Sequence, residues 1–218
     1  MNKPTFIIGV FYTKDTPYDS IFNEYALPSL MRLKKDYNID WRISVKENLG
    51  SWHKNVALKP LVISEMLYTL KKENDNRNLV FIDADSTINF YPSLFDELNE
   101  KNVEIAYHLL DWKTWYNYKD SNVKELLSGT LYLKNNDNIR ELCQTWYECA
   151  VLTGQWEQKV LEDLVEGERT REPWVKYYLP LEYCYISSMP NGKEPFVKIE
   201  NPIITHYNVS RKLKRVIK

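Results

Sequence analysis

Cysteine, net charge and long apolar runs are all scarce in this sequence of 218 residues. The three cysteines, Cys143, Cys149 and Cys184, are odd in number and form no C-x-x-C pair. This argues against a disulfide framework or a zinc site and favours a reducing compartment. A formal net charge of −1 lacks the basic excess of domains whose main partner is nucleic acid.

No stretch approaches the roughly 18 apolar residues of a membrane-spanning helix. The N-terminus lacks the apolar core and cleavage site of a signal peptide, so we expect a cytoplasmic protein without a transmembrane segment. Internal repeats and linkers rich in proline, glycine or serine are absent as well. We therefore predict one domain over 1–218 that ends in a basic tail at 208–218.

Strand-like and helix-like segments alternate in the first half of the chain. Strand signals at 6–12, 41–45 and 79–83 are separated by helix signals at 18–35 and 57–72. This alternation predicts an α/β fold, a Rossmann-like α/β/α sandwich around a mainly parallel sheet with right-handed crossovers.

Further elements are expected in the second half. A helix is expected after Asn136 or Asp137, one of which caps its N-terminus. It carries Cys143 and Trp146 on its apolar face. The other expected elements are a helix at 155–165 and strands at 103–110, 126–133, 183–186 and 203–207.

The run from Leu79 to Thr87 is an apolar strand that ends in two carboxylates, Asp83 and Asp85. Ligands of open α/β sheets bind just beyond the carboxyl ends of the strands. Two hard oxygen ligands at that place suit Mg²⁺ or Mn²⁺ beside a phosphate-bearing substrate. The alternative is a simple turn, in which an aspartate caps a loop or the next helix.

Two charged side chains fall on otherwise apolar helix faces. Lys59 shares a helical stripe with Ile63 and Met66, so it either extends out of the core, the commoner outcome, or points its ammonium toward phosphates. Glu157 lies within the apolar arc of its helix near Val160. Its carboxylate binds a metal, a cation or a substrate hydroxyl there, or it is a first-turn glutamate favoured by the helix dipole.

His206 directly follows the apolar run 202–205. This is the second place where a strand stops at a side chain able to bind a metal. A lone histidine is more often a hydrogen-bonded structural residue. Five cations follow it without an acidic residue among them: Arg211, Lys212, Lys214, Arg215 and Lys218. Such a group suits a diphosphate–metal complex, and otherwise it is a solvated terminus or a weak contact for an anionic membrane surface or nucleic acid.

Aromatic residues make up 14% of the chain and are densest at 107–118. Their faces, beside Asp, Asn and His groups, suit sugar rings. They suit a core equally well, and we favour the core for most of them.

Six segments, in the same order along the chain, resemble motifs of metal-dependent GT-A glycosyltransferases, especially family eight, the glycogenin and galactosyltransferase-like enzymes that use UDP-sugars. The segments are a first nucleotide-binding strand at 6–13, the D-x-D at 83–85, Leu-Ser-Gly-Thr-Leu at 127–131 (N-A-G-V-L in the family), Glu-Gln at 157–158 (D-Q), Leu-Pro-Leu-Glu-Tyr-Cys at 179–184 (L-P-x-x-Y-N) and His-Tyr-Asn-Val-Ser-Arg-Lys at 206–212 (H-x-x-G-x-x-K). Four positions depart from the pattern, so the chain looks like a divergent relative: Leu127, Glu157, Cys184 and Val209.

The resemblance implies a GT-A fold and a hexosyltransferase that moves a sugar from a UDP-sugar to an acceptor hydroxyl, with retention. It implies Mn²⁺ or Mg²⁺ held by Asp83, Asp85 and His206. It implies catalytic roles for Glu157 and Gln158. The residues expected at the nucleotide sugar are Tyr12, Thr13, Lys59, Asp83, Ala84, Gly129 and Lys212. The acceptor stays open among glycan, protein, lipid and modified DNA.

Two other functions fit parts of the sequence. The segment Asp83 to Thr87 also resembles the D-x-D-x-T motif of haloacid-dehalogenase-type phosphohydrolases, which implies Asp83 as nucleophile and Asp85 as general acid and base with Mg²⁺. Two strand–helix units precede the motif here, which weighs against that function. The four departures motivate a non-catalytic module that binds a nucleotide sugar or a glycan.

Overall fold

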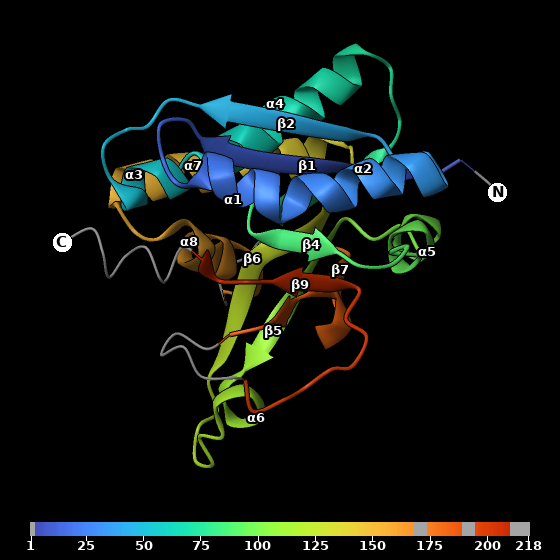
Figure 1. The fold of residues 1–218 in the computed structure, drawn as a ribbon. Coiled ribbons are helices and arrows are strands. Elements are labelled where there is room, and N and C mark those ends of the chain that lie inside the picture. The colour runs from blue at the N-terminus through green and yellow to red at the C-terminus, as the bar shows by residue number, and fades with distance from the viewer. Residues whose placement is uncertain (1–2, 168–173, 189–194, 210–218) are drawn as a thin grey trace.

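The computed structural model describes residues 3–167, 174–188 and 195–209, and within these ranges a six-stranded sheet forms the centre of the molecule (Figure 1). Its strands, in spatial order, are β2 (Trp41–Lys46), β1 (Phe6–Thr13), β3 (Asn78–Asp83), β6 (Lys124–Leu133), β5 (Ile105–Asp111) and β7 (Lys176–Tyr178). A second sheet in the described residues consists of β4 (Ser86–Ile88), β9 (Ile204–His206) and β8 (Tyr185–Ile186).

The large sheet is mixed. Strand β1 pairs in parallel with β2 and β3, and β7 with β5, whereas β6 is antiparallel to both of its neighbours. The connection from β5 to β6 holds the five-residue helix α6 (Trp112–Tyr116), which is too short for a crossover between parallel strands. The α/β class with a mixed, mainly parallel sheet is therefore confirmed. The strand expected at 126–133 is present as β6, but the alternation of elements did not predict its antiparallel direction.

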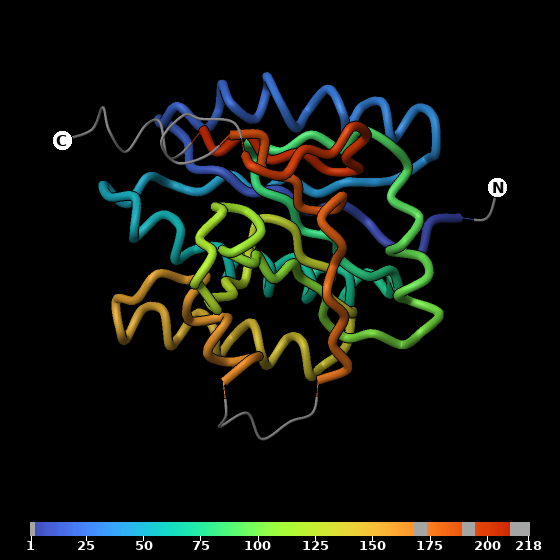
Figure 2. The backbone as a smooth tube through the Cα atoms, turned by 90° about the horizontal axis from the view of Figure 1, so that it is seen from below, coloured from blue at the N-terminus to red at the C-terminus, as the bar shows by residue number. Residues whose placement is uncertain are grey.

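Helices cover both faces of the large sheet. Figure 2 shows α1 and α2 along one side and α7 and α8 along the other. The first face is covered by α1 (Tyr18–Glu24), α2 (Ala26–Tyr37) and α5 (Leu94–Glu100), and the second by α4 (Lys59–Lys72), α7 (Asp137–Thr153) and α8 (Glu157–Glu166). A short helix, α3 (Trp52–Val56), precedes α4, and a 3₁₀ turn spans Leu181–Tyr183.

Strand side chains alternate between two cores. Ile8 and Val10 of β1 join the core under α1 and α2, whereas Ile7 joins the core under α4 and α7. Val80 and Phe81 of β3 divide in the same way. Successive side chains of a strand point to opposite faces, so a strand covered on both sides is a continuous apolar run, as the sequence indicates.

Helix boundaries follow local signals in most places. Asn136 caps α7 by accepting from the backbone N–H of Ile139 at 2.9 Å, as predicted, and Gly154 ends it with φ of 63°. The helix expected at 18–35 is instead two helices that meet at Tyr25. The segment expected at 57–72 is likewise preceded by the separate helix α3.

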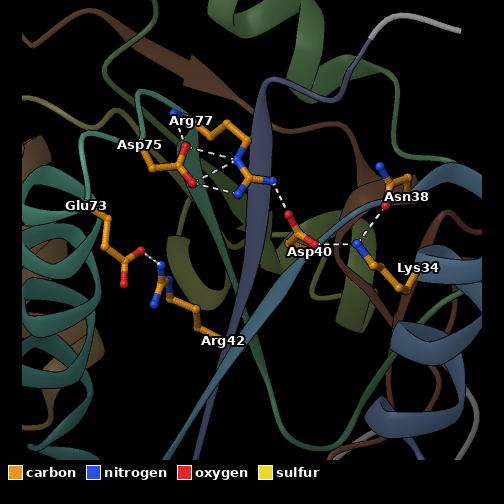
Figure 3. Close-up of polar contacts among 7 residues, drawn as sticks. All are labelled: Lys34, Asn38, Asp40, Arg42, Glu73, Asp75 and Arg77. Atoms are coloured by element: carbon orange, nitrogen blue, oxygen red, sulfur yellow. Dashed lines mark hydrogen bonds and ion pairs between the residues drawn. The ribbon is translucent and has the colours of Figure 1, made fainter.

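The amino ends of β2 and β3 carry a network of ion pairs (Figure 3). Arg77 contacts Asp40 at 2.5 Å and Asp75 at 2.6 Å, and Lys34 contacts Asp40 at 2.6 Å. These cations lower the pKa of both carboxyl groups, for Asp40 mainly through Lys34 and for Asp75 mainly through Arg77.

None of the helices in the described ranges is long and apolar enough to cross a bilayer.

Candidate active site

A cavity of about 480 Å³ lies at the carboxyl ends of β1 and β3. This is the edge of an α/β sheet at which ligands bind. Ten of the eleven residues that the sequence analysis placed in the site line it: Tyr12, Thr13, Lys59, Asp83, Ala84, Asp85, Gly129, Glu157, Gln158 and His206. The eleventh, Lys212, lies outside the described residues, as do the other basic residues of the tail.

Lys59 points into the cavity rather than out of the core, so the commoner of its two expected orientations is wrong. Its Nζ lies 2.9 Å from Asp83 Oδ1 and 3.1 Å from Glu157 Oε1, and its side chain is only 7% exposed. It also donates to Ser128 Oγ at 3.1 Å. Burial alone lowers the pKa of Lys59, but the two carboxylates outweigh it, so the pKa is raised and the ammonium stays charged.

Glu157 is the first residue of α8 and is 2% exposed. Besides Lys59, it accepts from Ser128 Oγ at 3.1 Å. Both alternatives for Glu157 thus hold together, because it is a first-turn glutamate and has a buried cationic partner. The amide of Gln158 is engaged at both ends, since Oε1 accepts from Ser128 N at 3.2 Å and Nε2 donates to Glu125 at 2.9 Å.

Asp83, Asp85 and His206 place ligand atoms within 4.8 Å of one another. Asp83 ends β3, Asp85 lies in the turn before β4, and His206 ends β9. The backbone N–H of Val209 donates to Asp85 Oδ2 at 2.8 Å, which ties the turn to the segment after β9. Two carboxylates and an imidazole are suitable donors for a divalent cation such as Mn²⁺.

His206 is held between two hydroxyl groups. Its Nδ1 lies 2.8 Å from Ser86 Oγ and its Nε2 2.8 Å from Thr130 Oγ1. Burial lowers the pKa of His206 to about 4, against an opposing effect of Asp83. The imidazole is therefore neutral at neutral pH, which is the form that binds a metal.

Gly129 allows β6 to pass directly beside these groups. A Cβ atom at this position would lie 2.9 Å from Cε1 of His206 and 3.2 Å from Oδ2 of Asp83. Any larger residue would push the histidine or the strand away. Thr130 also hydrogen-bonds Cys184, a buried residue that lines the cavity and whose thiol pKa is raised to about 12 by burial.

The cavity also contains residues that the sequence analysis did not single out. The most prominent are Trp52, the first residue of α3, and Trp156, which directly precedes Glu157. The aromatic stretch at 107–118, by contrast, divides between core and surface, with Tyr107 and Trp115 buried and Tyr118 exposed. Neither tryptophan belongs to a motif. The only sequence signal that could have placed Trp156 in the site is its position next to Glu157.

Neither a known family model nor a curated protein matches this sequence. Solved structures do. A glycosyltransferase involved in the glycosylation of the major capsid of PBCV-1 aligns with a TM-score of 0.64 at 13% identity, over 95% of this chain and 97% of that one. Mouse xyloside xylosyltransferase 1 aligns with a TM-score of 0.57 at 11% identity, over 94% and 98% of the two chains.

A third structure, galactosyltransferase LgtC in complex with donor and acceptor sugar analogues, aligns with a TM-score of 0.56 at 10% identity, over 93% of this chain and 87% of that one. At such identities the likeness establishes the fold. The chain therefore has a GT-A-like glycosyltransferase fold, in a divergent form. The resemblance read from the motifs is confirmed at that level.

Proposed function

We propose that this chain is a metal-dependent glycosyltransferase that transfers a hexose from a UDP-sugar to an acceptor hydroxyl, with retention at the anomeric carbon. The observation that carries the proposal is the meeting of Asp83, Asp85 and His206 within 4.8 Å in a cavity at the carboxyl edge of a GT-A-like sheet. The phosphohydrolase alternative expects its motif near the start of the fold, whereas Asp83 ends the third strand along the chain.

In this reaction the bond between the anomeric carbon and the diphosphate oxygen breaks, and its electron pair leaves with UDP. The acceptor oxygen forms the new bond to the anomeric carbon and releases its proton. The products are the glycosylated acceptor, UDP and a proton. A divalent cation held by Asp83, Asp85 and His206 would supply the positive charge that stabilises the departing diphosphate.

In this proposal the sugar end of the donor is held by Lys59, Glu157 and Gln158, which line the same cavity. Lys59 holds Asp83 and Glu157 in place, because its ammonium is buried between them. Glu157 orients the donor sugar. Gln158 is a positioning residue, since its amide joins β6 to α8 through Ser128 and Glu125.

The strand β1 supplies the groups proposed to contact the base. Tyr12 and Thr13 are its last two residues, and both line the cavity. The ring of Tyr12 stacks on Phe22 with centroids 5.0 Å apart, which fixes its orientation. A fixed aromatic face costs little conformational entropy when it binds a base.

The test is a panel of UDP-sugars with Mn²⁺, in which UDP release is measured for the wild type, Asp85→Asn and His206→Ala. Asp36→Asn, an exposed aspartate of α2, is the matched control. We expect metal-dependent UDP release that falls about 100-fold in the two site variants and is unchanged in the control. Equal release by all four proteins would overturn the metal assignment, and a wild type that neither binds UDP nor releases it from any donor would overturn the function.

A further inference from the structure

Two tryptophans form one wall of the cavity. The ring centroids of Trp52 and Trp156 lie 6.2 Å apart with an angle of 46° between the planes. Both residues line the cavity, and both are partly exposed rather than buried in a core. Large aromatic side chains that face a cavity offer flat apolar area for a ligand.

Both residues that carry these rings are held firmly. Ser51 caps α3 by accepting from the N–H of Lys54 at 3.3 Å. Asn55, on the same helix, accepts from the N–H of Leu49 at 2.8 Å and donates to Asn48 at 2.9 Å, so the loop before Trp52 is braced. The backbone carbonyl of Trp156 accepts two hydrogen bonds, at 3.0 and 3.1 Å, from the first turn of α8. The backbone that carries the two rings therefore needs little ordering when a ligand binds.

The tryptophans and the candidate metal ligands approach the cavity from different layers. Trp52 and Trp156 come from α3 and from the start of α8, the layer that also supplies Lys59 and Glu157. Asp85 and His206 border the small sheet, which packs with the α1 and α2 layer through residues such as Ile88 and Ile204. A donor whose diphosphate lies at Asp85 and whose sugar reaches Lys59 and Glu157 brings its sugar end to this layer, so a second molecule at the tryptophans lies beside the reacting sugar.

We propose that Trp52 and Trp156 form the acceptor subsite and that the acceptor is a saccharide, whose pyranose ring packs on the indole faces. This inference rests on the proposed glycosyltransferase function. A sugar ring presents an apolar C–H face together with hydroxyl groups at its edge, so it needs an aromatic surface flanked by hydrogen-bonding groups. Two residues with polar side chains, Glu157 directly after Trp156 and Asn55 on α3, line the same cavity.

The test separates acceptor binding from donor binding. Dissociation constants are measured by calorimetry for UDP with Mn²⁺, and by saturation-transfer NMR for a panel of methyl glycosides and disaccharides in the presence of UDP and Mn²⁺. The proteins are the wild type, Trp52→Ala, Trp156→Ala and Trp156→Phe. Trp41→Phe, a partly buried tryptophan of β2 outside the cavity, is the control, and melting curves establish that each variant folds.

We expect at least one saccharide to bind the wild type, with affinity reduced about tenfold in either alanine variant and less in Trp156→Phe. The dissociation constant for UDP should stay within about twofold of the wild type in all variants. A parallel loss of UDP affinity would mean that the wall stacks on the nucleobase, and the inference would be overturned. It would equally be overturned if UDP bound normally and no saccharide did. If saccharides bound in a way that depends on the tryptophans but UDP did not bind, the proposed glycosyltransferase function would be overturned and the saccharide site would stand.

Discussion

The two ends of the central strands carry charged clusters that are built in opposite ways. At the amino ends, two cations, Lys34 and Arg77, meet two carboxylates, Asp40 and Asp75, and the side chains of Lys34 and Asp40 are 44% and 42% exposed (Figure 3). At the carboxyl ends, among the described residues, the ammonium of Lys59 is buried beside carboxylates and a neutral imidazole.

The difference between the two clusters lies in charge compensation. The amino-end carboxylates each have a cation beside them, so that cluster needs no further ligand. At the carboxyl ends Lys59 pairs with two carboxylates, Asp83 and Glu157, and Asp85 adds a third beside them. An excess of negative charge that borders a cavity is a place where a cation binds, whereas a cluster of balanced charges is structural.

Removal of Lys59 should have the largest effect on stability. In Lys59→Met, the buried carboxylate of Glu157 and the partly exposed carboxylate of Asp83 lose their shared cation. We expect the free energy of unfolding, measured by urea denaturation with EDTA present, to fall by about 3 to 5 kcal/mol. A loss below about 1 kcal/mol would mean that the carboxyl-end cluster behaves like an ordinary surface cluster.

Acidification should weaken the carboxyl-end cluster through His206. Its folded pKa of about 4 lies below the value near 6.5 of an unfolded histidine, so the unfolded chain binds the extra proton first. The stabilisation is fully present above about pH 6.5 and is lost as the pH falls toward 4, by up to about 3 kcal/mol. Unfolding free energies of the metal-free wild type and of His206→Gln, compared from pH 7 to pH 4, should converge over that window. Parallel curves would contradict the prediction.

Gly129→Ala tests how closely β6 approaches the site. The added Cβ meets the ring of His206 at 2.9 Å, so we expect a loss of about 1 to 3 kcal/mol in stability and a weaker Mn²⁺ affinity, about 10-fold or more. Both are measurable, by denaturation and by calorimetry. The double variant Gly129→Ala/His206→Ala removes the clash. Its loss in the free energy of unfolding should therefore be smaller than the sum of the losses in the two single variants. Full additivity would show that the ring of His206 is not the obstacle.

The smallest effect is expected at the amino ends. Lys34→Met removes an exposed partner of Asp40, which keeps Arg77. We expect a loss of less than about 1 kcal/mol in the free energy of unfolding, and none in 1 M salt, where exposed pairs are screened. A cost close to that of Lys59→Met would remove the distinction between the two clusters.

Most of the fold could be predicted from the sequence, because the long elements have clear periods. The strands β1 and β3 were expected within one residue of their observed bounds, and α7 begins where a helix was expected. The short elements β4 and β7 were missed, since three residues are too few to show a period. The direction of β6 was missed as well, because it depends on the length of a connection rather than on the strand itself.

The candidate site was predictable where a charged residue interrupts an apolar pattern. Asp83, Glu157 and His206 stood out for that reason, and they meet in one cavity. The orientation of Lys59 could not be predicted, because an ammonium on an apolar helix face can reach water or a buried carboxylate, and only the neighbouring elements decide which. Trp52 and Trp156 carry no such interruption, and core tryptophans have the same local sequence signals.

The sequence by itself determined the alternation of strands and helices and the place of the carboxylates at the end of β3, because side-chain period and strand ends are local properties of the chain. The tertiary structure alone decided which distant residues meet. His206 reaches Asp83 only because β9 pairs with β4, and Trp52 faces Trp156 only because α3 and α8 lie beside the same cavity. These contacts depend on pairing and packing between segments far apart in the chain, which no local pattern encodes.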